Sequence, residues 1–146
     1  MTTKSPLTVS LTTTFEYAHP LGALAPYFEA LTEGHALGAK CSRCAKVWFP
    51  PRIVCTCGEA TTWEDLPGTG IIEVLTTGPG MVPLSAVSGN LVFALVRFDG
   101  ADNLALVRCD ATATLNSGMR GRVTRAATRG PHPASAVVFD IAPVLP

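Results

Sequence analysis

Four closely spaced cysteines constrain this chain more than any other feature of its sequence. Cys41 and Cys44 form a C-x-x-C pair, and Cys55 and Cys57 follow as a C-x-C pair just before Gly58. Two tight turns, or knuckles, that each carry two thiolates bring four soft ligands to one point, which is the tetrahedral set that structural zinc prefers. Four sulfur ligands leave no open position for a substrate. The pattern therefore predicts a closed, structural zinc site rather than a catalytic one.

The alternative interpretations of these cysteines are a redox pair and free thiols in the core. A redox C-x-x-C pair usually lies at the start of a helix in a βαβ unit, and the sequence shows no such unit. His35 is near enough in sequence to replace one ligand, although four cysteines already complete the set. The C-x-C knuckle is one residue shorter than the common C-x-x-C form, so we expect tighter geometry and a lower metal affinity. The fifth cysteine, Cys109, ends an apolar run and is expected to be a small buried residue.

Composition favours a folded protein with many turns. The chain has 146 residues, of which 47% are hydrophobic and 15% charged, and its formal net charge is zero. This is enough apolar chain for a real core and too little net charge for disorder. No apolar run reaches the length of a membrane span, and the N-terminal segment lacks a signal-peptide pattern. We therefore expect a cytoplasmic protein, a compartment in which clustered cysteines bind metal more often than they form disulfides.

The chain divides into three predicted segments: an arm and helix over 1–34, a zinc ribbon over 35–66, and a barrel over 67–146. Residues 1–19 have weak periodicity and are expected to form a mobile arm. Residues 20–33 predict an amphipathic helix, with Pro26 in its first turn and Gly34 as its stop. So short a helix is not stable alone. It must dock either on the core of this protein or on a partner subunit.

The last segment predicts five short strands bounded by turn residues. They are expected over 69–77, 91–98, 103–109, 121–128 and 136–142. Five strands in so short a segment favour a small closed barrel of the OB type, so the fold class is mainly β. The intervening stretch from Gly78 to Asn90 is predicted to be a long apolar loop that covers a ligand or faces a partner.

The neutral net charge hides two basic clusters. The first lies in the ribbon and the second near the end of the barrel; their members are Lys40, Arg43, Lys46 and Arg52, and Arg120, Arg122, Arg125 and Arg129. Local basic patches on a neutral protein favour a small anionic ligand or a defined partner surface over a long polyanion. No nucleophile elbow, phosphate-binding loop, dinucleotide fingerprint or HExxH helix is present, and no catalytic residue is predicted. A binding or accessory role follows.

Taken in order, these modules resemble the small zinc-ribbon/OB-fold proteins encoded beside thiolases and related acyl-CoA condensing enzymes. The resemblance covers roughly residues 24–142. Its most telling stretches are Tyr27-Phe28 through Leu31, Cys41 to Cys44, Trp48-Phe49-Pro50-Pro51-Arg52 with Cys55, Gly68 to Ile72, Leu91 to Val96, and Gly118 to Val123. The resemblance implies a rubredoxin-like four-cysteine ribbon followed by a five-stranded OB barrel. The C-x-C knuckle departs from the pattern of that family.

The resemblance also implies a function. Members of the family are non-catalytic subunits bound to a thiolase-like protein that carries the active-site Cys and His residues. Examples belong to steroid side-chain aldolases, benzoylsuccinyl-CoA thiolase, an archaeal acetoacetyl-CoA thiolase assembly and a phloroglucinol acetyltransferase. This chain would complete such a hetero-oligomer and help to shape its acyl-CoA site. Its ribbon cations, Lys40, Arg43, Lys46 and Arg52, are candidates for contacting the phosphates of a CoA ester.

Two other functions remain open. Zinc ribbons and OB barrels also bind nucleic acid, but an OB surface for single strands needs exposed aromatic platforms. After Pro67 the aromatic residues are Phe93, Phe98 and Phe139, of which Phe93 is expected to be core, and the sequence pI is about 6.8. A free-standing acyl-CoA-binding protein is the third possibility.

Overall fold

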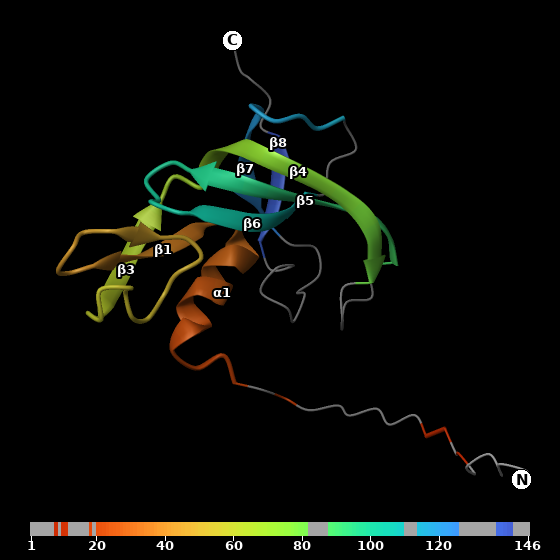
Figure 1. Ribbon diagram of the computed structural model, residues 1–146. Helices are drawn as coiled ribbons and strands as arrows, with labels where there is room; N and C mark the ends of the chain where they lie inside the picture. Colours follow the sequence, from red (N-terminus) through yellow and green to blue (C-terminus); the bar gives the residue numbers. More distant parts are fainter. Residues whose placement is uncertain are drawn as a thin grey trace, which may run out of the picture.

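The computed structural model describes residues 20–81, 88–109, 114–125 and 137–141, together with residues 8, 10, 11 and 18. Within these ranges a 3-10 turn, η1 (Gly22–Leu24), and one helix, α1 (Ala25–Glu33), precede eight strands (Figure 1). The predicted mobile arm over 1–19 lies almost entirely outside the described residues. No helix in the described ranges is long and apolar enough to cross a bilayer.

The predicted helix forms, and it packs on the core of this protein. Pro26 lies in its first turn, where a missing N–H costs nothing, and Gly34 ends it with a left-handed φ of 79°. The N–H of His35 donates to the carbonyl of Ala30 at 2.9 Å, which satisfies one of the last free carbonyl groups. Tyr27 and Leu31 lie one turn apart and are both buried, so this is the face that docks.

The ribbon is a small antiparallel sheet with the strand order β2-β1-β3. Its strands are β1 (Ala36–Cys41), β2 (Val47–Trp48) and β3 (Thr61–Leu66). Strand β1 lies in the middle and pairs Ala39 with Trp48 on one side and with Trp63 on the other. Because Cys41 ends β1, this sheet fixes where the first knuckle begins.

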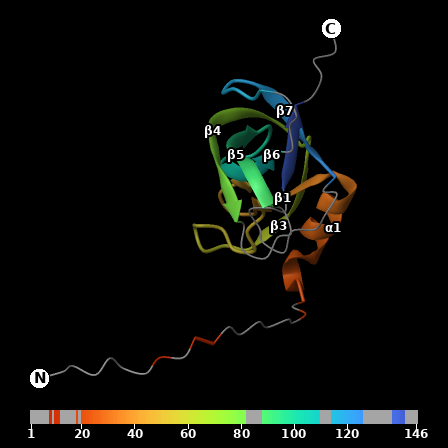
Figure 2. The same cartoon turned by 90° about the vertical axis from the view of Figure 1, so that its right-hand side faces the viewer.

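The five predicted barrel strands are confirmed. They are β4 (Thr69–Met81), β5 (Ser88–Phe98), β6 (Leu104–Cys109), β7 (Arg120–Thr124) and β8 (Val138–Ile141). They close into a barrel in the order β4-β5-β6-β8-β7, in which β6 and β8 pair in parallel and the other pairs are antiparallel. Numbered within the barrel this order is 1-2-3-5-4, the Greek-key closure of an OB fold. Figure 2 shows these strands surrounding the core, with α1 to one side.

The prediction of a loop from Gly78 to Asn90 is wrong at both ends. Strand β4 continues to Met81 and β5 begins at Ser88, and the two pair through this stretch to Met81↔Ser88; residues 82–87 lie outside the described residues. Glycine and proline suggested a loop. Strand β4 pairs with β5 along one edge, but with β7 along the other edge only over Thr69–Ile71. At Pro79 this other edge forms no hydrogen-bond ladder in the described chain, so the missing N–H of proline is tolerated there.

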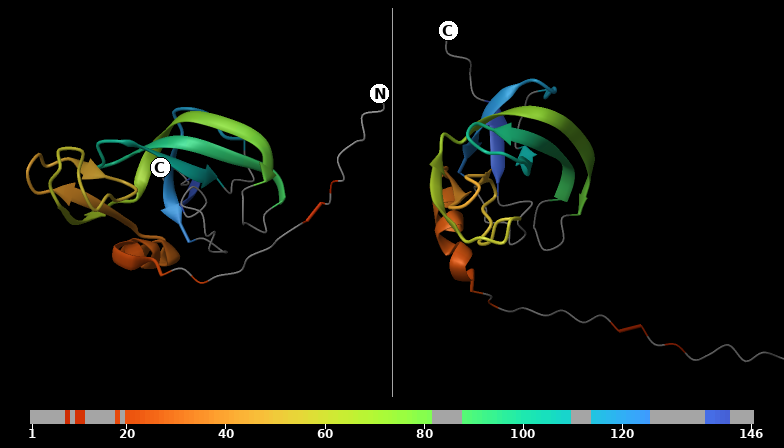
Figure 3. Two further views of the ribbon diagram at one scale, coloured as in Figure 1. Left: turned by 60° about the horizontal axis from the view of Figure 1, so that its bottom comes forward. Right: turned by 60° about the vertical axis from the view of Figure 1, so that its left-hand side comes forward.

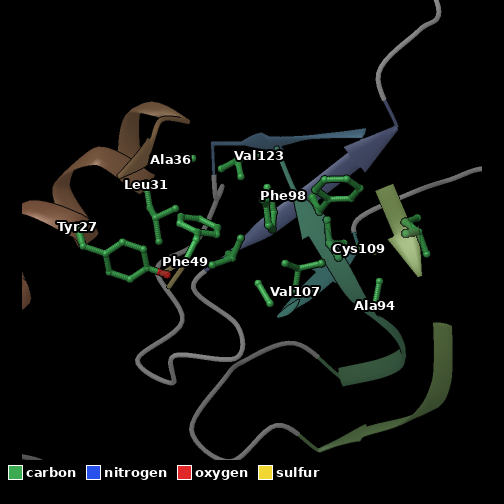
Figure 4. Close-up of a cluster of buried hydrophobic side chains, with 14 residues drawn as sticks. Tyr27, Leu31, Ala36, Phe49, Ala94, Phe98, Val107, Cys109 and Val123 are labelled. Carbon is green, nitrogen blue, oxygen red and sulfur yellow. The ribbon is translucent and has the colours of Figure 1, made fainter. Parts of the chain in front are cut away.

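One hydrophobic core joins the helix, the ribbon and the barrel. Tyr27 of α1 contacts Phe49 of the ribbon at a ring-centroid distance of 6.0 Å, Phe49 contacts Phe98 of β5 at 4.6 Å, and Phe98 contacts Phe139 of β8 at 5.7 Å. All three contacts are edge-on, the geometry that aromatic quadrupoles favour. Figure 4 shows Phe49 between the helix and the barrel. Cys109 is buried in the same cluster, as expected.

Phe93 does not belong to this core, contrary to expectation. The side chains of Ala94, Val96 and Phe98 are buried, whereas Phe93 is only half-buried. Because successive residues of a strand face opposite sides, Phe93 lies on the outer face of β5. An apolar run alone does not show which of its residues face inward, so the prediction from sequence placed Phe93 in the core.

The turn between β5 and β6 attaches the barrel to the ribbon through polar contacts. The side-chain amide of Asn103 donates to the carbonyl of Phe49 at 2.8 Å, and its side-chain oxygen accepts from the N–H of Phe49 at 3.0 Å. Next to it, a carboxylate oxygen of Asp102 accepts from the N–H of Val47 at 2.7 Å. These bonds satisfy the free edge of β2. The ribbon is thereby held at one end of the barrel, away from the far end of the β4–β5 hairpin (Figures 1 and 3).

Candidate metal centre

The four predicted cysteines come together in the structure. Their Sγ atoms all lie within 4.8 Å of one another. Cys41 and Cys57 are 3.5 Å apart at Sγ, and Cys44 and Cys55 are 3.6 Å apart. Four sulfurs at about 2.3 Å from a zinc ion lie roughly 3.8 Å from one another, so the observed cluster has the size of a tetrahedral zinc site. Cys41 and Cys55 are buried, while Cys44 and Cys57 are exposed.

The two knuckles close by the same hydrogen bonds, with one residue fewer in the second. In the first knuckle the N–H of Ala45 donates to the carbonyl of Cys41 at 3.1 Å, and the N–H of Cys41 donates to the backbone carbonyl of Lys46 at 2.9 Å. In the second, the N–H of Gly58 donates to the carbonyl of Cys55 at 2.9 Å, and the N–H of Cys55 donates to the backbone carbonyl of Glu59 at 2.8 Å. The C-x-C pair is therefore accommodated by a shorter turn.

Each turn reverses through a left-handed residue directly after its second cysteine. Gly58 has φ of 87°, which glycine adopts freely, and Ala45 has φ of 58°, which is rare for a residue with a Cβ. Such strain persists only where the surroundings enforce it. Here the tight turn that brings Cys41 and Cys44 together enforces the left-handed conformation of Ala45.

Backbone amides near the sulfurs favour thiolates. The N–H of Cys44 lowers the pKa of the Cys41 thiol, and the N–H of Cys57 lowers the pKa of Cys55 to about 6. The N–H of Lys46 acts in the same direction on Cys44, but the neighbouring sulfurs of Cys41, Cys55 and Cys57 outweigh it and raise the pKa of Cys44 to about 11. A cation held between the sulfurs would offset the repulsion between thiolates, which fits a metal-binding cluster.

His35, the alternative ligand, and Cys109, the fifth cysteine, both lie outside the cluster. The Nδ1 atom of His35 lies 3.9 Å from a carboxylate oxygen of Glu33, at the end of α1. Cys109 is buried in the barrel core. The arrangement is thus a four-sulfur set, and its chemistry fits a resident structural zinc.

The ribbon cations differ in how far they are already engaged. Lys40 forms an ion pair with Glu64 at 3.5 Å, and the guanidinium of Arg52 lies 4.6 Å from the centroid of the Trp48 ring. Arg43 and Lys46 are exposed on the first knuckle. In the second basic cluster Arg120 is paired with Asp99, Arg122 and Arg125 are exposed, and Arg129 lies outside the described residues.

A shallow pocket lies beside Arg52. It has a volume of about 140 Å³, and its walls come from η1, the ribbon sheet and the loop before the second knuckle: Ala23, Ala39, Arg52, Ile53, Thr61, Thr62 and Trp63. Pockets that hold drug-sized ligands are usually about 300–1,000 Å³. This one has room for a phosphate group or one side chain, and not for a whole CoA ester.

The barrel gives little support to nucleic-acid binding. Phe98 and Phe139 are buried in the core, which leaves Phe93, itself half-buried, as the single phenylalanine on the outer surface of the described barrel. Stacking platforms for single strands need several accessible rings in succession.

Comparison with known proteins confirms the resemblance for the ribbon and for the fold. Residues 28–64 match the family model described as the ChsH2 rubredoxin-like zinc ribbon domain. The fold is similar to that of the Ltp2–ChsH2(DUF35) aldolase structure, with a TM-score of 0.63 and 20% identity over 86% of this chain and 98% of that one. It is also similar to a DUF35-family protein of unknown function from Sulfolobus solfataricus, with a TM-score of 0.57 and 16% identity over 84% of this chain and 87% of that one. No curated protein matches the chain.

Proposed function

We propose that this protein is a non-catalytic, zinc-binding accessory subunit of a thiolase-type enzyme complex that acts on acyl-CoA. The observation that carries the proposal is the ribbon itself. It matches the ChsH2 zinc-ribbon model and is joined to a closed barrel, as in the ChsH2(DUF35) component of an aldolase. In this role the partner carries the reacting groups, and this chain stabilises the complex and completes the acyl-CoA site.

The first part of the proposal is that Cys41, Cys44, Cys55 and Cys57 hold one structural zinc. Protein purified without chelator should contain one zinc per chain, and a Cys55→Ser variant should lose it. A Cys109→Ser variant is the matched control, because Cys109 lies in the core and outside the cluster. Wild-type protein that carries no zinc would contradict this part.

The second part concerns the CoA phosphates. Arg43, Lys46 and Arg52 are the ribbon cations that form no ion pair with another described residue, and Arg52 borders the pocket. Arginine binds phosphate oxygens in pairs, so Arg43 and Arg52 are the stronger candidates. Lys40 is the weaker one because Glu64 already offsets its charge.

This part is tested by reversing charge within the complex. Arg43→Glu and Arg52→Glu should each raise the KM for the CoA ester several-fold while leaving kcat nearly unchanged, as expected when binding alone is lost. Arg97→Glu is the control, because Arg97 lies on the barrel, where it pairs with Glu73. Unchanged kinetics in both ribbon variants would exclude Arg43 and Arg52 as the phosphate contacts.

The third part, the partner, is tested by purifying a tagged copy from the native host. A thiolase-like protein identified by mass spectrometry, at a fixed ratio to this chain on size exclusion, is the expected result. A tagged chain that elutes alone and binds an acyl-CoA would instead favour the free-standing binding protein. A salt-sensitive gel shift with single-stranded nucleic acid would favour the nucleic-acid function.

A further inference from the structure

One face of the ribbon sheet carries two tryptophans on either side of an alanine. Ala39 of the central strand β1 pairs with Trp48 of β2 and with Trp63 of β3. Residues that lie directly opposite each other in a sheet share a face, so all three side chains project to the same side. The small side chain of Ala39 therefore leaves a recess between two large ones. This recess is the pocket beside Arg52, which Ala39 and Trp63 both line.

Two planar side chains form the walls of the pocket. The guanidinium of Arg52 lies 4.6 Å from the centroid of the Trp48 ring, so Arg52 covers that ring and borders the pocket itself. Trp63 borders it from β3 and is 39% exposed. An indole and a guanidinium both stack on flat rings. The pocket therefore suits a flat aromatic group better than a branched aliphatic one.

Hydrogen bonds hold the wall that contains Arg52 in place. The backbone N–H of Thr61, at the start of β3, donates to the carbonyl of Ile53 at 3.2 Å. The hydroxyl of Thr61 donates to the carbonyl of Arg52. These bonds tie the segment before the second knuckle to β3. The pocket is thus formed by the fold itself, as is usual for sites that bind small molecules.

The nucleotide end of CoA carries both groups that this pocket fits. Its adenine is flat and about the size of one aromatic side chain, which agrees with a pocket volume of about 140 Å³. Its ribose carries phosphates next to the base, and Arg52 forms no ion pair with another described residue. Arginine binds phosphate oxygens in pairs. An aliphatic side chain from a partner could fill the same volume, but it would leave this cation without a counter-charge.

We propose that the pocket binds the adenine ring of the CoA ester, stacked against Trp63, with Arg52 on the neighbouring phosphate. The inference rests on the proposed function and names the end of the CoA ester that the ribbon holds. The pantetheine arm and the acyl group then lie outside the pocket, toward the partner that carries the reacting groups. This chain recognises the nucleotide, and the partner recognises the acyl group.

The test measures the binding of two fragments of CoA to the purified complex by calorimetry. Adenosine 3′,5′-bisphosphate contains the base, and 4′-phosphopantetheine lacks it. Trp63→Leu keeps apolar bulk on β3 but removes the stacking ring, so it should weaken adenosine 3′,5′-bisphosphate about tenfold and leave 4′-phosphopantetheine unchanged. Trp63→Phe keeps a ring and should stay within about threefold of wild type. Phe93→Ala, on the outer face of the barrel, is the matched control and should change neither affinity.

The outcomes separate this inference from the function on which it rests. A wild-type complex that binds neither fragment would contradict the proposed acyl-CoA function as well as the adenine site. Binding of 4′-phosphopantetheine alone, or a Trp63→Leu complex that keeps its full affinity for adenosine 3′,5′-bisphosphate, would overturn the adenine site and leave that function standing. Equal weakening of both fragments in Trp63→Leu would also overturn it, and would instead indicate that the pocket holds a side chain of the partner.

Discussion

Replacing Phe49 with alanine is the change that tests most severely whether ribbon and barrel form one structure. The side chain is 0% exposed and contacts the rings of Tyr27 and Phe98. Truncating a buried phenylalanine to alanine costs about 3–5 kcal/mol, which includes the cavity that remains. For a chain of this size each kcal/mol lowers Tm by roughly 2–4 °C, so the melting temperature should fall by about 6–20 °C.

The assay is thermal unfolding of the zinc-loaded protein, followed by circular dichroism and calorimetry. Phe93→Ala is the matched control: it removes the same side chain from the half-buried outer face of β5 and should cost no more than about half as much. Because one core joins the three segments, wild-type protein should melt in a single transition. A Phe49→Ala protein that melts within about 3 °C of wild type, or a separate ribbon transition in wild type, would show that ribbon and barrel do not share one core.

Three further changes probe other contacts. Burial raises the pKa of Tyr27, so the folded protein keeps the hydroxyl proton above pH ~10, where the unfolded chain loses it. The contribution of Tyr27 to the free energy of unfolding should therefore be full below that pH and decline above it, and Tyr27→Phe should lessen the decline. At pH 7, urea titration of Tyr27→Phe should give a stability equal to wild type or higher by about 1 kcal/mol, because the buried hydroxyl has no hydrogen-bond partner in the described chain. Asn103→Ala removes both side-chain bonds to the backbone of Phe49 and should lower the free energy of unfolding by about 1–3 kcal/mol; no change would show that water replaces them. Gly70→Ala would place a Cβ 2.7 Å from the backbone carbonyl oxygen of Arg97 on β5 and should lower the free energy of unfolding by about 3 kcal/mol. Gly78→Ala, whose Cβ would meet nothing within 4 Å, should cost little, so equal urea midpoints for the two variants would contradict this packing.

Much of the fold follows from local signals in the sequence. The helix is predicted because Pro26 and Gly34 mark its ends, and both act as expected. The metal centre is predicted because ligand spacing alone brings cysteines together on tight turns, whatever the rest of the chain does. Likewise, each barrel strand is a β-branched or apolar run between turn residues, and all five form.

The remaining features depend on contacts between distant segments, which local patterns do not encode. Asp102 and Asn103 read as ordinary turn residues, yet their side chains bond to the edge of β2, which is more than fifty positions away in the chain. Phe93 was misplaced because strand register, and not hydrophobicity, decides which side it faces. The β4–β5 hairpin is longer than predicted because strand pairing overrides its glycine and proline content.

The same limit applies to the functional site. The C-x-C spacing predicts a shorter second knuckle, but not that the ring of Trp48 on β2 would lie against the guanidinium of Arg52. Basic residues were visible as a cluster, whereas the ion pair that engages Lys40 appears only when Glu64 lies beside it on β3. The sequence shows which residues carry a charge, whereas the fold decides which of those charges are already paired.

In the proposed function, this chain assists a catalytic partner and performs no chemistry alone. The most direct measurement is turnover of an acyl-CoA substrate by three purified samples: the co-purifying thiolase-like protein alone, this zinc-loaded chain alone, and the two together. We predict no turnover by this chain, little by the partner, and a large increase when they are combined. Turnover by this chain alone, or an unchanged rate on combining the two, would contradict the accessory role.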